Sequence, residues 1–165
     1  MTIAELLLPE VDQEMATTRR VLERVPDEKL GWKPHDKSWS MGDLASHVVN
    51  LIKWAGFTMD QREVDLATVP EQVNQAATSR AQLLEWFDAN AAAARAALQK
   101  SDADYFVPWS LKQNGQTIFT MPRYTCIHSF FLNHVVHHRA QLSVYLRLND
   151  IPVPSMYGPS ADENM

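Results

Sequence analysis

The stretch NHVVHHRAQL, residues 133–142, holds three of the six histidines of the chain within five positions. His134 and His138 are four residues apart, so on an α-helix they lie one turn apart on the same face and can converge on one ion. They also fall in an apolar stripe with steps of three or four, which comprises Tyr124, Ile127, Phe131, His134, His138, Leu142, Tyr145 and Leu148. The stretch therefore predicts a helix whose inward face carries two imidazoles.

Three further segments of the chain have helical spacing. We expect the first helix from Thr2 to about Arg24, the second from Met41 to about Gln61, the third from the TSRAQ stretch to about Lys100, and the last from just after Thr120 to about Leu148. The capping-box patterns TIAE and SMGD mark the first two starts. An Asn-Gly pair predicts a small hairpin over Trp109 to Phe119. The predicted fold class is all-α: one domain, residues 1–165, folded as an up-down four-helix bundle with a small hairpin or loop before the last helix.

The composition excludes several classes of function. The net charge is about -5 and no long run of lysine or arginine is present, so we expect no nucleic-acid partner. The N-terminus has no basic leader and its apolar run ends after Leu8, which predicts a cytoplasmic protein without a signal peptide or membrane span. The single cysteine, Cys126, cannot form an internal disulfide and is expected to be a core residue. No phosphate-binding glycine loop or serine nucleophile elbow is present.

The second helical segment adds a third inward-facing histidine. Its predicted apolar face contains His47 among Leu44, Val48, Leu51, Ile52 and Ala55. One buried histidine is usually satisfied by a hydrogen bond, but three inward-facing imidazoles lose hydration unless a common partner satisfies them. A divalent metal is such a partner, because neutral imidazole is a preferred ligand of zinc, nickel and iron. His47, His134 and His138 are therefore the predicted metal ligands, and three protein ligands leave one coordination position open.

These motifs also resemble those of a known family. HVVHHRAQL, WSMGDLASHVV, IFTMPR and the tail IPVPSMYGPSADE together resemble the DinB-like proteins, a damage-inducible superfamily of metal-binding four-helix bundles, over nearly the whole chain. The resemblance implies a metal triad of one histidine on the second helix and two on the last, which matches His47, His134 and His138. The common His-Arg-Gly-Gln motif of the family appears here as HRAQ, with Ala140 in place of glycine, a difference of one methyl group. The resemblance also implies a homodimer.

The resemblance implies the fold and the ligands more strongly than it implies the reaction. A metal with three histidines and one exchangeable water can polarise a carbonyl or lower the pKa of a bound water or thiol. Characterised members of the superfamily are thiol-dependent transferases and isomerases that use a low-molecular-weight thiol such as bacillithiol or mycothiol. The leading expectation is thus a thiol S-transferase-like enzyme acting on a small-molecule substrate. The alternatives are a metal-dependent hydrolase and a non-catalytic metal-binding or small-molecule-binding bundle.

Other polar residues near the predicted triad have two interpretations each. His137 contacts a ligand or lies at the surface, Gln141 binds an anion or ties down the helix, and Arg123 binds an anionic substrate or pairs with an acid. Arg139 is expected to point away from the stripe, as a solvated or interhelical ion-pairing residue. His35 and His128 are not expected to be ligands.

One acid and several aromatic residues are expected to stabilise the fold. Asp43 is expected to act as the capping acid of the second helix, and Trp32 and Trp39 to pin the loop between the first two helices. A partner-binding helical module is a third class of function. Its interface would comprise aromatic residues that are equally well explained as core, namely Trp54, Phe57, Trp86 and Phe87.

Overall fold

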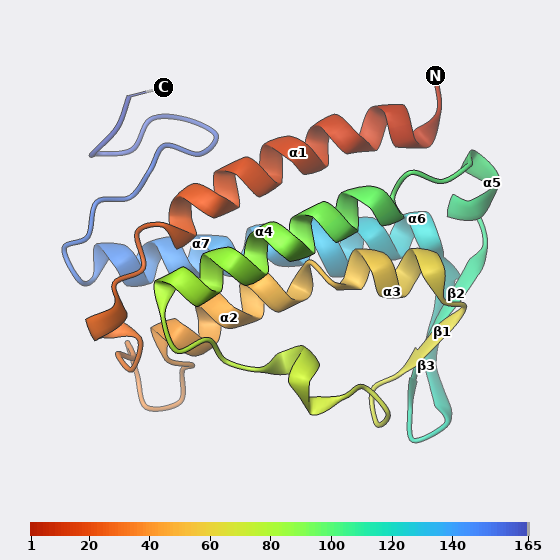
Figure 1. Cartoon of the computed structure of the whole chain (residues 1–165), viewed down its shortest axis with the longest axis horizontal. Helices are drawn as coiled ribbons and strands as arrows, with labels where there is room; N and C mark the ends of the chain where they lie inside the picture. The colour runs from red at the N-terminus through yellow and green to blue at the C-terminus, as the bar shows by residue number, and fades with distance from the viewer. Residues whose placement is uncertain (165) are drawn as a thin grey trace.

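Helices make up most of the structure, a computed structural model that describes residues 1–164 (Figure 1). All four predicted helical segments are helical. The helices are α1 (Ile3–Leu22), α2 (Met41–Leu51), α3 (Trp54–Asp60), α4 (Arg80–Ala97), α5 (Asp102–Tyr105), α6 (Arg123–Cys126) and α7 (Asn133–Arg147), with short 3₁₀ turns η1 (Asp27–Lys29) and η2 (Glu71–Asn74). Within residues 1–164, we find no helix with both the length and the apolar content that a membrane span requires.

Capping side chains fix where the long helices begin. The Thr2 hydroxyl accepts a hydrogen bond from the Glu5 backbone while the Glu5 carboxylate accepts one from the Thr2 backbone, and Ser40 and Asp43 form the same reciprocal pair at α2. Each pair satisfies backbone N–H groups that the first helical turn leaves free. The predicted starts and the capping role of Asp43 are thus confirmed.

Two of the predicted continuous helices are interrupted. The expected Met41–Gln61 helix divides at Ile52 and Lys53, where the Lys53 and Ala55 amides bond to carbonyls only three residues back and tighten the turn. The last helix contains a π-helical segment, η3 (Ile127–Leu132), between α6 and α7. At this wider turn Ile127 and Phe131 stay in the main core while Phe130 stacks on Phe119 of the hairpin.

A small sheet corrects the all-α prediction. The expected hairpin is present as β2 (Pro108–Gln113) and β3 (Gln116–Pro122), with Asn114 and Gly115 at positive φ in the turn. An additional strand, β1 (Glu63–Asp65), pairs in parallel with β2 and completes a three-stranded sheet. β1 was not predicted, because its three residues are too few to show alternation. The Asp65 carboxylate accepts hydrogen bonds from the Asn114 and Gly115 amides, which joins β1 to the turn.

The long helices enclose the main core. α1 packs against α4 and α7, and α2 packs against the same two helices. The sheet lies at one end of the helices, and the segment that follows α7 lies at the other end (Figure 1). A second, smaller core joins the sheet to α3 and η3 and includes Val64, Trp109 and Cys126. The direct packing of α2 on α7 is the contact that positions the predicted metal ligands.

The buried face of α7 differs from the predicted stripe by one residue. Its buried residues are Val135, Arg139, Leu142 and Leu146, whereas His134, His138 and Tyr145 are half-buried. The two ends of the predicted stripe, Tyr124 and Leu148, are 42% and 59% exposed. The histidines therefore border the core and do not lie at its centre.

Candidate metal centre

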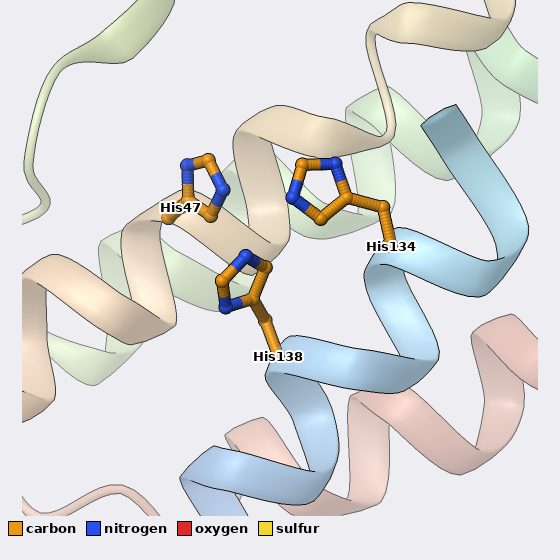
Figure 2. A group of neighbouring side chains, drawn as sticks. All are labelled: His47, His134 and His138. Atoms are coloured by element: carbon orange, nitrogen blue, oxygen red, sulfur yellow. The ribbon is translucent and has the colours of Figure 1, made fainter. Parts of the chain in front are cut away.

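Two helices bring the three predicted ligands together. Figure 2 shows His47 on α2 and His134 and His138 on α7, with their rings converging in the space between the helices. The ring centroids are 4.6 Å apart for His47 and His138, 4.8 Å for His134 and His138, and 5.4 Å for His47 and His134. One nitrogen from each ring lies within 4.8 Å of the other two. The structure thus assembles the residues that the sequence singled out.

The donor set fits a divalent metal. The Nε2 atom of His47 is buried and has no hydrogen-bond partner in the structure. A buried polar atom of this kind is normally satisfied, so it indicates a missing partner. Two nitrogens bound to one tetrahedral zinc at 2.0–2.1 Å lie about 3.4 Å apart, so nitrogens now up to 4.8 Å apart would have to move closer to bind one ion. No fourth histidine, cysteine or carboxylate of the described residues joins the group, so the three histidines could hold a metal ion with an open position.

The electrostatics of the site keep the three imidazoles neutral. Burial, followed by the neighbouring His138 and His134 rings, lowers the pKa of His47 from 6.5 to about 4. Burial is also the main cause that lowers the pKa of His134 and of His138. Neutral imidazole has the free lone pair that a metal requires, so the site is ready to bind at neutral pH without losing protons.

Gln141 orients one of the ligands. Its Oε1 atom lies 2.7 Å from Nδ1 of His138. A carboxamide oxygen can only accept, so Nδ1 carries the hydrogen and Nε2 keeps the lone pair. Hydrogen bonds of this kind fix the tautomer and orientation of metal-binding histidines. Gln141 was predicted to bind an anion or to tie down the helix, and in the structure its contact is with His138 of the same helix.

Trp39 also belongs to the site, although the sequence alone did not indicate it. Its ring packs against His47 with centroids 4.7 Å apart and stacks on His138 at 5.7 Å, and its carbonyl accepts a hydrogen bond from the Tyr145 hydroxyl. Both tryptophans meet the predicted loop-pinning role, because Trp32 packs edge-on against Tyr145 of α7 and Trp39 contacts α2 and α7 through the two histidines. Trp39 precedes α2 in an irregular segment, where no periodic pattern could indicate its direction.

A cleft of about 490 Å³ opens beside the triad. Trp39 and His47 contribute to its wall, together with Asp43, Ser46 and Asn50 of α2 and Asn74 of η2. The opposite wall is held in place by side chains of α2, because Ser46 accepts from the Ala77 amide at 2.8 Å and Asn50 donates to the Gln75 carbonyl at 3.0 Å. A small molecule in this cleft would contact His47.

The two candidate arginines, Arg139 and Arg123, bind other partners and not the triad. Arg139 is only 1% exposed and pairs with Glu14 of α1 at 2.7 Å, so the solvated interpretation is wrong and the interhelical ion pair is correct. The reason is that the buried face of α7 contains Val135 and Arg139, each one position after a predicted inward histidine, and this face packs against α1. Arg123 is also buried and donates to the Gln61 carbonyl at 2.9 Å, away from the triad.

The remaining candidates do not reach the triad as ligands. His137 is exposed, although its ring contacts His138, and His35 is exposed in the loop before α2. His128 contributes to a separate cleft between α1 and α6. Cys126 is buried in the smaller core, and burial raises the pKa of its thiol to about 11, in agreement with a core role.

Comparisons of the sequence and of the structure with known proteins both point to DinB-like proteins. The sequence profile of the DinB family matches residues 1–164. The uncharacterized protein YrdA of Bacillus subtilis (strain 168) is 25% identical over 150 residues, which cover 91% of this chain and 85% of YrdA. The crystal structure of a DinB-like protein from Bacillus cereus ATCC 10987 superposes with a TM-score of 0.74 at 23% sequence identity, over 94% of this chain and 98% of that one.

Proposed function

The chain belongs to the DinB family, and on that premise we propose that it is a metal-dependent enzyme that binds one divalent ion through His47, His134 and His138 and acts on a small molecule. The observation that carries the proposal is the convergence of three neutral imidazoles, one with an unpartnered buried Nε2, beside an open cleft. Zinc, nickel and iron are all suited to three imidazole ligands.

The expected reaction is transfer to the sulfur of a low-molecular-weight thiol. A bound divalent metal would supply a lowered pKa for a coordinated thiol or water. In the transfer, the thiolate sulfur forms a bond to an electrophilic carbon, the leaving group departs with its bonding electrons, and the thiol proton passes to solvent. In this proposal Gln141 fixes the orientation of the His138 ring, and Trp39 covers one side of the His47–His138 pair. The substrate would enter through the cleft.

The state of the one cysteine supports an external thiol. Cys126 is buried, so a substrate cannot reach it. Burial also raises the pKa of its thiol to about 11, so it is not a thiolate at neutral pH. A thiol-dependent reaction of this protein therefore needs a thiol from solution. The same site with a bound water in place of the thiol would be a hydrolase, and the two reactions differ in whether product formation requires added thiol.

Metal content tests the proposal. Protein purified without a nickel column is measured by elemental analysis as wild type and as the variants His47→Ala, His134→Ala and His128→Ala, the last being a histidine outside the triad. We expect about one metal per chain in wild type and in His128→Ala, and loss in the other two. Screening of thiols against electrophiles then follows on the loaded protein. A metal-free wild type that folds as well as all its variants and takes up no added zinc would overturn the proposal.

A further inference from the structure

The charged residue in the lining of the cleft beside the triad is acidic. Among the described residues that line it, Asp43 is an acid and none is a lysine or arginine. Asp43, His47 and Asn50 follow one another at spacings of four and three, so they form a stripe along one face of α2. Lys53 lies outside the lining, where its ammonium is held by Asn50 Oδ1 at 2.8 Å and the Val73 carbonyl at 3.0 Å. In the metal-free protein, the charge of the lining residues therefore favours a cation over an anion.

The Asp43 carboxylate has capacity for a ligand. Its Oδ2 atom accepts from the Ser40 hydroxyl at 2.6 Å and, more weakly, from the Ser40 amide at 3.4 Å. In the described part of the chain, Oδ1 accepts no hydrogen bond and Asp43 has no ion-pair partner, in contrast to the acids that pair across α1 and α4. The residue is exposed. One oxygen of a charged residue that lines the cleft thus has no hydrogen-bond partner among the described residues.

Trp39 connects the cleft to the triad. It is 49% exposed, contacts the rings of His47 and His138, and also lines the cleft. The face of an indole ring attracts cations, because its quadrupole is negative there. Along α2, Asp43 and His47 are separated by about one helical turn, roughly 5.4 Å. A ligand that contacts Asp43 and Trp39 would therefore lie beside His47, which lines the same cleft.

We propose that this cleft recognises a positively charged amine group of the substrate, with Asp43 as the anionic partner and Trp39 as the aromatic surface. The inference rests on the proposed function, since it assigns the substrate class of the same site. Substrates whose recognised group is a carboxylate or phosphate find no cationic partner in the cleft lining and bind more weakly.

The test uses the metal-free protein, so that binding to the cleft is separated from binding to a metal. Benzyltrimethylammonium, whose quaternary nitrogen cannot coordinate a metal, is titrated against benzyl alcohol and benzoate in a ¹⁵N NMR experiment. The Trp39 indole N–H signal is assigned by its loss in Trp39→Phe. We expect this signal to shift with the ammonium compound, more weakly with the alcohol and least with benzoate. The ammonium affinity should fall roughly fivefold in Asp43→Asn and decrease with added NaCl.

Two control variants separate charge from folding. Glu85→Gln removes one negative charge from an exposed site on α4, and Ser40→Ala weakens the same helix cap while keeping the Asp43 charge. Both should bind the ammonium compound as wild type does. Equal affinity for the three probes, no shift of the Trp39 signal, or equal loss in Asp43→Asn and Ser40→Ala would overturn the inference.

The two proposals can fail separately. If the protein takes up zinc but the titration fails, the amine specificity is wrong and the metal site stands. If the titration succeeds in a protein that takes up no zinc, the cleft is an amine-binding site and the metal-dependent function is wrong.

Discussion

Replacing Arg139 by methionine should destabilise the protein far more than replacing an exposed arginine. The Arg139 guanidinium is buried between α7 and α1, where it pairs with the Glu14 carboxylate and donates to the Glu14 carbonyl and the Thr18 hydroxyl, both at 3.1 Å. It also donates to the Tyr157 hydroxyl at 2.6 Å, and Tyr157 in turn donates to Glu14. Arg139→Met leaves the Glu14 charge buried without its cationic partner.

The expected cost follows from that isolated charge. Removing one partner of a buried ion pair costs about 3–5 kcal/mol, because the remaining charge stays desolvated. Replacing both partners with apolar groups removes the uncompensated charge, so Arg139→Met combined with Glu14→Met should cost less than the sum of the single changes by at least about 2 kcal/mol. By contrast, Arg95 pairs with Asp12 at 3.0 Å with both side chains about half exposed, and Arg95→Met should cost at most about 1 kcal/mol.

Urea unfolding at pH 7, followed by circular dichroism, measures these free energies for wild type, the two single variants, the double variant and Arg95→Met. A cost below about 1 kcal/mol for Arg139→Met would refute the reasoning. So would a double variant whose cost equals the sum of the single ones.

Further predictions concern the triad and the cysteine. Burial, followed by the neighbouring His138 and His134 rings, lowers the pKa of His47 in the folded state to about 4 from 6.5, so the unfolded chain takes up this proton first. The metal-free protein should therefore lose stability, on the order of 1–2 kcal/mol once solvent screening is allowed for, as the pH falls from about 6.5 to about 4. His47→Ala should lose less over that window in urea titrations at several pH values. Gln141→Leu should weaken zinc affinity about 10–100-fold in chelator competition while Gln141→Glu retains most of it, and equal affinities would contradict the orienting role. Because burial raises the pKa of Cys126 to about 11, iodoacetamide at pH 8 should label it only after unfolding, as mass spectrometry would show.

The parts of this structure that local rules govern could be predicted from the sequence. The capping pairs at Thr2 and Ser40 involve residues three positions apart, and the spacing of His134 and His138 spans one helical turn. The Asn114-Gly115 turn depends on residues that accept positive φ. Each of these features depends on a segment of a few residues, so the sequence contains all the information that they need.

The features that depend on contacts between distant segments could not be predicted. β1 is a strand only because it pairs with β2, more than forty residues later. Arg139 was expected outside the buried face, because periodicity alone does not give the rotation of α7 relative to α1. In the structure Arg139 faces α1 and pairs with Glu14. Trp39 contacts His138 across about a hundred positions, and a loop residue has no periodic neighbours from which its direction could be inferred.

The difference between the predicted and observed faces of α7 explains how one site can be both rigid and accessible. At the centre of the core, as the predicted stripe placed them, His134 and His138 would be dry and well fixed, but no substrate could reach them. On the observed face Arg139 and Leu142 anchor the helix in the core, and the histidines lie at its border. There the Nε2 atom of His47 is shielded from solvent, while the cleft lined by Trp39 and His47 is open. A reactive metal needs both conditions, since it must bind a substrate and yet hold its ligands in a fixed geometry.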